Sequence, residues 1–251
     1  MTQLLQGRTA IITGASRARG IGLATARMFA EHGARVAILD LSLEEAQAAA
    51  AALGAQHLGL ACDVTSAAAC QAAVAEALRQ FGQIDILVNN AGLTQKRGVM
   101  DVTAEDYELV TGVVLRGALH MSQAVVPHMR GRGCGSIICI SSMSAEQGGG
   151  VFGGTHYCAA KAGVLGMARA MARELGPDNV RVNSVCPGLV MTDFSRGGTT
   201  DERKNEMAQS FPLRRVGQPA DIAGACLYLA SDLAAWVTGA TIDVNGGAFM
   251  H

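Results

Sequence analysis

Short aliphatic runs rich in Val and Ile alternate along this chain with longer, alanine-rich stretches. Repeated alternation of this kind gives right-handed crossovers, one parallel sheet and helices on both faces of that sheet. The pattern therefore predicts an α/β, doubly wound fold. Strands are expected at residues 8–13, 35–39, 57–61, 84–88, 136–140, 180–185 and 241–244, and helices at 20–31, 43–53, 67–81, 104–129, 155–175 and 220–230. Thr103 and Asp106 resemble a capping box at the start of the long fourth helix.

The length and the regular alternation indicate how the chain is organised. It has 251 residues, 49% of them hydrophobic, which is enough to bury a substantial core. No linker, low-complexity tract or repeat interrupts the pattern, so we expect a single domain over residues 1–251. The longest irregular segment is about 188–200, and long loops in compact domains tend to be functional. We therefore expect a substrate loop at about 188–210.

Composition argues against several classes of partner. The net charge is −1 and no block of Lys and Arg stands out, which argues against a nucleic-acid partner. No apolar run approaches the ~20 residues that span a bilayer, so no membrane partner is expected, and the N-terminus does not resemble a signal peptide. The seven cysteines include no Cys-x-x-Cys pair, which favours reduced thiols in a cytoplasmic protein. The histidines and cysteines show no metal-ligand spacing, so no metal is expected.

A glycine-rich turn follows the first expected strand and opens the first expected helix. It contains Gly14, Ser16, Arg17, Arg19 and Gly20, followed by Ile21-Gly22. Glycines at such a junction let backbone N–H groups approach a pyrophosphate, and the helix N-terminus adds partial positive charge. The turn therefore predicts a dinucleotide site, although many glycine turns bind nothing.

The end of the second strand bears on the choice of dinucleotide. Asp40 lies there, where a carboxylate can accept hydrogen bonds from the adenosine ribose and would repel a 2′-phosphate. Asp40 therefore favours NAD over NADP, and the alternative is an ordinary solvated, helix-capping Asp. Arg17 and Arg19 argue the other way, because guanidinium groups near the turn can attract a phosphate. We give Asp40 more weight, because a carboxylate close to a phosphate dianion is unfavourable.

Tyr157 and Lys161 are four residues apart on an expected helix, so they share one face of it. The Lys161 ammonium is expected to lower the pKa of the Tyr157 phenol from about 10. A Tyr with a lowered pKa can take a proton from an alcohol or return one to a ketone. The alternative is that the pair lies on an exposed helix face without a chemical role.

Taken in order, several short motifs resemble the short-chain dehydrogenase/reductase family, of the compact type with about 250 residues. The resemblance covers essentially the whole chain. It rests on Thr13-Gly14…Gly20-Ile21-Gly22, Asp63-Val64, Asn89-Asn90-Ala91-Gly92, Ile140-Ser141-Ser142, Tyr157-x-x-x-Lys161, Asn183, Pro187-Gly188 and Val237-Thr238-Gly239. The resemblance implies a Rossmann-like sheet of seven parallel strands, a nicotinamide cofactor, and hydride exchange between an alcohol and a carbonyl.

The resemblance also implies roles for individual residues. Tyr157 is similar to the family's acid/base, Lys161 to the residue that holds the nicotinamide ribose, and Ser142 to the donor that orients the substrate oxygen. Besides the glycine-rich turn, Asp40, Tyr157 and Lys161, the implied cofactor contacts are Asp63, Val64, Asn90, Ala91, Gly92, Pro187, Gly188, Val190 and Thr192.

Two departures from the family pattern stand out. Five residues separate Gly14 from Gly20, where three are usual, so the turn should bulge and Arg17 and Arg19 should reach further around the pyrophosphate. Val114 occupies the position of an Asn that, in the family, helps to hold a water linked to the Lys. Val has no side-chain hydrogen bond to offer, so the proton relay is expected to be slower or rerouted.

The segment between Ser142 and Tyr157 should border the substrate. Its candidate polar contacts are Ser144, Glu146, Gln147 and His156, and Phe152 is a candidate apolar wall; each is alternatively a solvated loop residue. This polar, glycine-rich segment and an aromatic content of only 4% suggest a small polar secondary alcohol, such as a polyol or sugar acid. Arg196 can pair with an anionic substrate or be simply exposed.

Two other functions stay open on the sequence alone. One is a ketone or 3-oxoacyl thioester reductase; the other is an NAD(H)-binding sensor or structural subunit with little catalysis. The family resemblance also implies a homotetramer or homodimer that pairs through the fourth and fifth helices. Apolar stripes there favour pairing but are alternatively ordinary core: Val110, Val113, Val114, Ala118 and Met121, with Val164, Met167, Ala168 and Met171.

Overall fold

A computed structural model describes residues 3–149, 153–194 and 198–250. These residues form one seven-stranded sheet in the order β3-β2-β1-β4-β5-β6-β7, and every adjacent pair of strands is parallel. The expected Rossmann-like sheet is therefore confirmed. The strands are β1 (Thr9–Thr13), β2 (Arg35–Asp40), β3 (Leu58–Ala61), β4 (Ile86–Asn89), β5 (Gly135–Ile140), β6 (Val180–Pro187) and β7 (Thr241–Val244).

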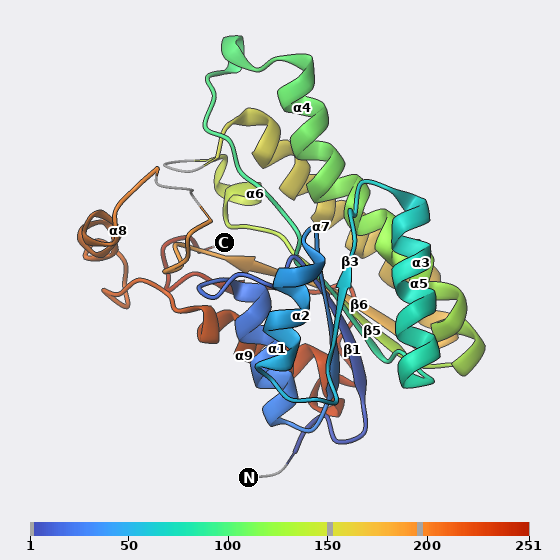
Figure 1. Cartoon of the computed structure of the whole chain (residues 1–251). Coiled ribbons are helices and arrows are strands. Elements are labelled where there is room, and N and C mark those ends of the chain that lie inside the picture. The colour runs from blue at the N-terminus through green and yellow to red at the C-terminus, as the bar shows by residue number, and fades with distance from the viewer. Residues whose placement is uncertain (1–2, 150–152, 195–197, 251) are drawn as a thin grey trace.

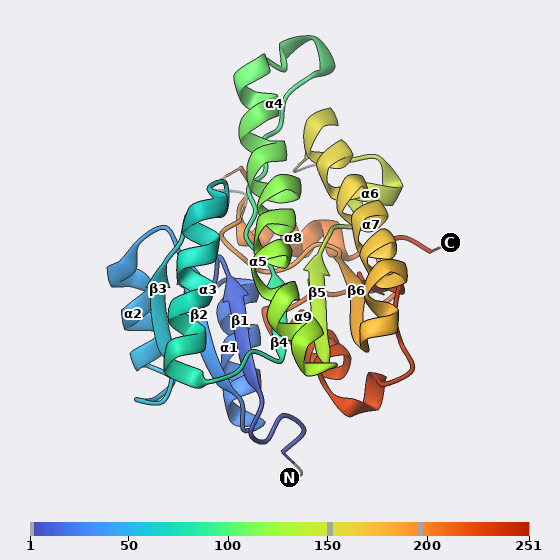
Figure 2. The ribbon, with the colours of Figure 1, turned by 90° about the vertical axis from the view of Figure 1, so that its right-hand side faces the viewer.

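Helices cover both faces of the sheet (Figures 1 and 2). On one face lie α3 (Ala67–Phe81), α5 (Gly117–Arg132) and α7 (Thr155–Leu175). The other face carries α1 (Ile21–Glu31), α2 (Leu43–Ala51) and α9 (Pro219–Ala230). The remaining helices are α4 (Ala104–Thr111), α6 (Ser144–Gln147), α8 (Asp201–Ala208) and the short 3-10 turns η1 (Val99–Asp101), η3 (Gly176–Asp178) and η4 (Asp232–Ala234).

The strand period of two explains how one apolar run serves two cores. Ile11 and Ile12 are adjacent in β1 and both are fully buried. Ile11 packs into the cluster under α3, α5 and α7, whereas Ile12 packs into the cluster under α1, α2 and α9. Successive side chains on a strand point to opposite faces, so a strand covered on both faces must be apolar throughout.

The long fourth helix is interrupted by a π-helical segment. It begins at Ala104, and the preceding Thr103 forms the expected capping box with Asp106. The π-helical segment η2 (Gly112–Arg116) lies between α4 and α5 and contains Val114. The helix pattern predicted a single element and gave no sign of this bulge. Bulges of this kind occur frequently at functional sites.

By length and composition the same helix, Ala104–Arg132, is apolar enough to cross a membrane, with a mean hydropathy of 1.4 over its most apolar window. Within the fold, 44% of that window is buried, and α5 packs on α3 and on the sheet. A buried core helix has the same composition, so this finding is weak evidence for a membrane span.

Two short helices were not predicted from the sequence. One is α6, a single turn shortly after β5, and the other is α8, whose sequence DERKNEMA has no apolar stripe. A cap does mark α8, because the Thr200 side chain accepts a hydrogen bond from the backbone N–H of Arg203 and Asp201 and Glu202 follow. Thr followed by two acidic residues is a helix-start signal that the sequence does carry.

The apolar stripes named for subunit pairing belong largely to the core of this chain. Six of those nine side chains are buried within it: Val110, Val114, Ala118, Met121, Val164 and Ala168. Apolar side chains that are about half exposed on the fourth helix, such as Tyr107 and Leu109, lie outside the named stripes. The stripes therefore give no argument for an oligomer.

Candidate active site

Ser142, Tyr157 and Lys161 come together where β5 ends and α7 begins. Ser142 follows shortly after β5, and its Oγ accepts a hydrogen bond from the Ser144 N–H at 3.1 Å. The neighbouring Ser141 donates its hydroxyl to the backbone oxygen of Lys161 at 2.8 Å, which fixes the first turns of α7 against the strand end. Tyr157 and Lys161 are both buried. The carboxyl edge of a parallel sheet is where α/β proteins bind their ligands.

The electrostatics of this pair differ from the sequence expectation. Burial raises the pKa of Tyr157 to about 12, and a hydrogen bond from Ser142 opposes this only in part. Lys161 lies with Nζ 5.9 Å from the centre of the Tyr157 ring and donates instead to the Ile140 carbonyl at 2.7 Å. The expectation that Lys161 lowers the pKa of Tyr157 is therefore wrong for this arrangement, because loss of water around the phenol is the larger effect.

Burial also governs Lys161 itself. It lowers the pKa of the ammonium to about 8. A Cβ placed on Gly92 would lie 3.6 Å from Lys161 Nζ and 3.9 Å from Cγ2 of Val114, so both side chains border Gly92. Val114 thus lies in the vicinity of the ammonium, where an amide side chain would supply a polar partner and Val supplies none.

The glycine-rich turn has the shape that a pyrophosphate site requires. Gly14 has φ +62°, and a Cβ there would lie 2.8 Å from Cα of Ala91. A Cβ on Gly22 would lie 2.6 Å from Nδ2 of Asn90, and the Asn90 amide donates to the Thr13 and Gly14 carbonyls at 2.8 Å each. Only glycine fits at these two positions, so the backbone can approach a ligand closely at the start of α1. This cradle fits a dinucleotide phosphate group.

Asp40 is held at the end of β2 by the same turn. Its Oδ2 accepts hydrogen bonds from the backbone N–H of Ser16 at 3.0 Å and from the Ser16 hydroxyl at 2.7 Å, while Oδ1 accepts from the Leu41 N–H at 2.9 Å. The carboxylate is thus fixed beside the candidate nucleotide cradle.

The two arginines of the turn lie on its outside. The extra residues form an exposed turn closed by the Gly20 N–H, which donates to the Arg17 carbonyl at 2.9 Å. Arg17 is exposed. Arg19 does not follow the expected direction around the pyrophosphate and forms ion pairs with Asp193 at 3.3 Å and Asp201 at 2.6 Å. The expected bulge is present, but Arg19 serves a different contact.

The other candidate cofactor contacts lie at the carboxyl ends of neighbouring strands. Asp63 accepts from the Thr65 N–H and hydroxyl after β3, and the adjacent Val64 is buried. At the end of β6 the Pro187 carbonyl accepts from the Met143 N–H at 3.0 Å. The other members are Ile21 at the start of α1, Asn90, Ala91 and Gly92 after β4, and Gly188, Val190 and Thr192 after β6.

Four of the five candidate substrate contacts lie on α6 and at the start of α7, two helices that pack against each other. Ser144 and Gln147 bound α6, and Gln147 is exposed. His156 is buried, and its Nε2 lies 3.1 Å from the Gln95 side-chain oxygen, so it braces the loop after β4. Phe152 and Arg196 lie outside the described residues.

Two side chains near the site were missed by sequence reasoning. Phe194 places its ring 6.3 Å from the Tyr157 ring at an interplanar angle of 52°, and it is 38% exposed. Gln95 is the polar partner of His156. No local signal could have found Phe194, because the contact joins two segments that are far apart in the chain.

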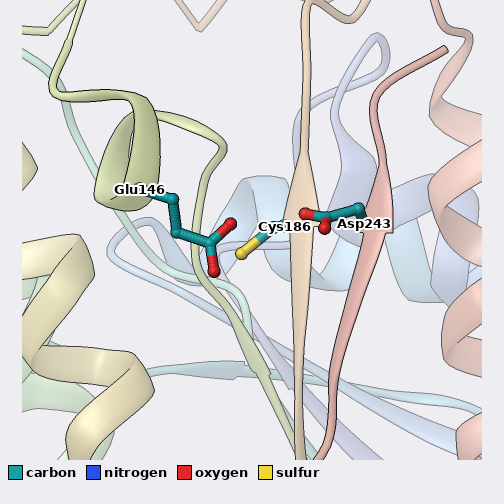
Figure 3. A group of neighbouring side chains, drawn as sticks. All are labelled: Glu146, Cys186 and Asp243. Carbon is teal, nitrogen blue, oxygen red and sulfur yellow. The ribbon is translucent and has the colours of Figure 1, made fainter. Parts of the chain in front are cut away.

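Three potential metal donors also meet beside the site (Figure 3). Glu146 of α6, Cys186 of β6 and Asp243 of β7 bring their donor atoms within 4.8 Å of one another, a grouping that sequence spacing could not reveal. Burial, and then the charges of Glu146 and Asp243, raise the pKa of the Cys186 thiol to about 11. A thiol that keeps its proton is a poor metal ligand, since the thiolate is the binding form.

A cavity among the described residues lies further out, at the carboxyl end of β7. Its volume is about 480 Å³, and its lining includes Leu189, Pro212, Leu213 and Asp243. Tyr157 is not part of that lining, so this cavity is distinct from the candidate catalytic group.

Comparison with known proteins agrees with the fold. A family model described as enoyl-(acyl carrier protein) reductase matches residues 14–249. An uncharacterized short-chain type dehydrogenase/reductase, y4mP, of Sinorhizobium fredii is 53% identical over 99% of this chain and 100% of its own length. The L-rhamnose 1-dehydrogenase (NAD(P)(+)) of Azotobacter vinelandii is 40% identical, with 99% of each chain covered.

Among solved structures, a short-chain type dehydrogenase/reductase from Mycobacterium marinum superimposes with a TM-score of 0.91 at 33% identity, covering 99% of this chain and 98% of that one. The fold and the site define a nucleotide-dependent oxidoreductase that acts on CH–OH or keto groups. The chain belongs to the short-chain dehydrogenase/reductase family.

Proposed function

We propose that this protein is an NAD-dependent dehydrogenase that reversibly oxidises a small polar secondary alcohol, such as a polyol, a sugar or a sugar acid. The observation that carries the proposal is the convergence of Ser142, Tyr157 and Lys161 at the sheet edge that also holds the glycine cradle. The choice of NAD is supported by Asp40, because a 2′-phosphate beside its fixed carboxylate would meet like charge.

The proposed residues act on the substrate oxygen and its proton. Tyr157 takes the hydroxyl proton during oxidation and returns it during reduction, and Ser142 donates a hydrogen bond to the same oxygen. The Lys161 ammonium supplies positive charge in the same buried region. Bound NAD supplies the hydride acceptor. It would be held by the glycine-rich turn, Asp40, Asp63, Val64 and the residues after β4 and β6.

The pKa values of Tyr157 and Lys161 determine at which pH the two groups carry charge. Tyr157 with a pKa near 12 is a strong base once deprotonated, but it holds its proton tightly at neutral pH. Lys161, whose pKa is about 8, loses its charge as the pH rises above that value. Alcohol oxidation should therefore become faster at higher pH, where more of Tyr157 is deprotonated and able to accept the hydroxyl proton.

The sugar class of substrate is supported by one relative, which is named an L-rhamnose dehydrogenase. A second candidate is reduction of a 3-oxoacyl thioester, which is supported by a relative from Chlamydia trachomatis that is named a 3-oxoacyl-[acyl-carrier-protein] reductase. Asp40 argues against this second candidate if NADPH is its hydride donor, so an assay of cofactor preference distinguishes the two. A dinucleotide sensor with little catalysis is the third candidate, and Val114 is the feature that favours it.

We also propose a single domain with a substrate loop at about 188–210, a cytoplasmic location, and a homotetramer or homodimer. The loop assignment is supported by Phe194, which lies beside Tyr157.

An assembly is supported by β7, which is an edge strand, and by two exposed side chains close before it. Trp236 is 99% exposed and Leu233 is 65% exposed. Light scattering after gel filtration tests the assembly, and a monomer at micromolar concentration would contradict it.

The function is tested by a panel of polyols, sugars, sugar acids and a 3-oxoacyl thioester, each with NAD(H) and with NADP(H). We expect turnover of a sugar or polyol with NAD⁺. Tyr157→Phe should lower kcat by about 10²–10⁴-fold and leave NADH binding intact, because only the proton-transfer step is lost. Tyr107→Phe on the exposed side of α4 is the matched control. Wild-type turnover in Tyr157→Phe, or NADH binding with no turnover anywhere in the panel, would refute the proposed chemistry.

A further inference from the structure

Arg19 joins two parts of the molecule that are far apart in the sequence. Its Nη1 lies 3.3 Å from Oδ1 of Asp193, and its Nη2 lies 2.6 Å from Oδ2 of Asp201, a residue 182 positions away. Asp193 follows the segment after β6, and Asp201 opens α8. The Arg19 guanidinium therefore links the glycine-rich turn to Asp193, in the segment after β6, and to Asp201, at the start of α8.

The far side of this contact is anchored by a buried lysine. Lys204 of α8 is only 4% exposed, and its Nζ donates to the Thr192 carbonyl at 2.7 Å and lies 3.4 Å from Oδ1 of Asp201. Asp201 is thus shared between Arg19 on one oxygen and Lys204 on the other. A buried ammonium is unfavourable unless it is paired and hydrogen-bonded, so this anchor is a fixed element rather than a passing surface contact.

The same segment touches the catalytic group. Phe194 follows Asp193 directly and lies against the Tyr157 ring. Thr192 adds a further constraint, because Lys204 binds its carbonyl while its Oγ1 accepts a hydrogen bond from the Phe194 N–H at 3.4 Å. A continuous series of contacts therefore leads from the nucleotide cradle through Asp193 to the residue that packs on Tyr157.

We propose that Arg19 is a positioning residue that ties Asp193 and α8 to the glycine-rich turn, across the entrance to the dinucleotide cradle. We call Arg19 together with Asp193 and Asp201 the Arg19 tether. The tether holds Phe194 over Tyr157 and must break before the dinucleotide leaves. The inference rests on the proposed function only in taking the ligand to be NADH.

The competing role for Arg19 is direct contact with a nucleotide phosphate. The two roles predict opposite effects of removing the acidic partners. If Arg19 ties the region down, Asp193→Asn loosens the tether and NADH leaves faster. If Arg19 binds a phosphate, Asp193→Asn frees the guanidinium from a competing carboxylate, and NADH leaves more slowly.

The experiment measures NADH release by stopped-flow fluorescence in Arg19→Gln, Asp193→Asn, Asp201→Asn and the double variant Arg19→Gln/Asp193→Asn. Each single variant should release NADH about 3- to 10-fold faster, in line with exposed ion pairs, and the double variant should add little to Arg19→Gln. Wild-type release should accelerate at high salt, which screens the exposed pairs, and Arg19→Gln should lose most of that acceleration. Arg203→Gln is the matched control, since that α8 arginine pairs only within its own helix, with Glu206, among the described contacts.

A second readout needs no ligand. In cofactor-free protein, backbone amides of α8 should exchange hydrogen faster in Arg19→Gln than in wild type, while those of β1 and β4 stay unchanged and show that the fold is intact. Slower NADH release in Asp193→Asn, or unchanged release and exchange in Arg19→Gln, would overturn the tether. If wild-type protein binds no NADH, the proposed function fails, and the exchange of α8 still decides whether the tether exists.

Discussion

The glycine-rich turn (residues 14–22) and the α8 region (residues 192–194 and 198–208) face each other, but different kinds of contact hold them in place. The turn is fixed by buried backbone contacts: Gly14 and Gly22 leave no room for a Cβ, and the Asn90 amide donates to two of its carbonyls. The α8 region is fixed mainly by charges, and the three groups of the Arg19 tether are about half exposed. Steric fit tolerates almost no change, whereas exposed charges form and break readily.

This difference assigns a different task to each region. A cradle that must present backbone N–H groups to a phosphate gains from rigidity, because its donors are oriented before the ligand arrives. A region that must let substrate and dinucleotide pass gains from contacts that are individually weak. Substitutions in the first region should therefore affect the whole protein, and substitutions in the second should affect exchange rates and substrate affinity.

The largest expected effect is that of Gly22→Ala. The new methyl would lie 2.6 Å from Nδ2 of Asn90, and 2.8 Å from both Cα of Ala15 and the Gly14 carbonyl oxygen. Overpacking at such a site costs about 1–3 kcal/mol of stability and displaces the cradle, so NADH affinity should fall by about 100-fold. Urea unfolding and fluorescence titration measure the two effects.

Gly224→Ala is the control for this substitution. Gly224 lies inside α9 and a Cβ there meets nothing within 4 Å. The same chemical change should leave NADH binding unaltered and raise stability by about 0.5–1 kcal/mol, because Ala is the better helix former. Equal behaviour of the two variants would show that the cradle is not sterically fixed.

A second, smaller effect concerns Lys161 and the pH dependence of the protein's stability. Folding lowers the pKa of Lys161 from its usual 10.5 to about 8, because the ammonium loses its water. Between pH 8 and 10.5 Lys161 therefore binds more protons in the unfolded chain than in the folded one, so it adds a rise with pH to the stability of cofactor-free protein. Buried thiols of raised pKa, such as Cys139 and Cys186, add a fall in the same window, so the Lys161 contribution is the difference between wild type and Lys161→Met. Lys161→Met should lack this rise and be about 1 kcal/mol more stable at pH 7, after allowing for the hydrogen bond lost by the Ile140 carbonyl.

Urea unfolding at about pH 7 and about pH 9.5 measures this prediction. The upper limit stays below about pH 10, because the raised pKa of Tyr157 makes the folded state retain its proton above that pH and lowers stability there. Salt should leave the Lys161 effect unchanged, since a buried charge is poorly screened, whereas it weakens the Arg19 tether. Equal pH dependence of stability in wild type and Lys161→Met would contradict the burial of a charged Lys161.

The sequence predicted the first region far better than the second. Periodicity located all seven strands, and the glycine spacing located the cradle, because both depend on local rules of backbone geometry. The sequence could not predict that Arg19 pairs with Asp193 and Asp201, since any exposed arginine has many candidate partners. The pKa of Tyr157 was predicted in the wrong direction because spacing along a helix reveals the neighbouring ammonium but not the loss of water.

The smallest expected effect concerns Phe194, the apolar side chain of the α8 region that lies against Tyr157. Phe194→Ala removes one aromatic contact at a partly exposed position, so KM for the alcohol should rise about 3- to 10-fold with little change in kcat or in NADH affinity. Phe194→Leu keeps an apolar surface and should recover most of the loss. Global stability should change by less than about 0.5 kcal/mol in both variants.

Phe29 of α1, the helix that follows the glycine-rich turn, is the residue to compare with Phe194. It is fully buried in the cluster under α1, α2 and α9. Phe29→Ala should cost about 3–5 kcal/mol of stability, several times more than Phe194→Ala. If Phe194→Ala destabilised the protein as strongly as Phe29→Ala, the α8 region would be part of the core. If it left KM unchanged, Phe194 would not border the substrate, and the proposed substrate loop would lose its main support.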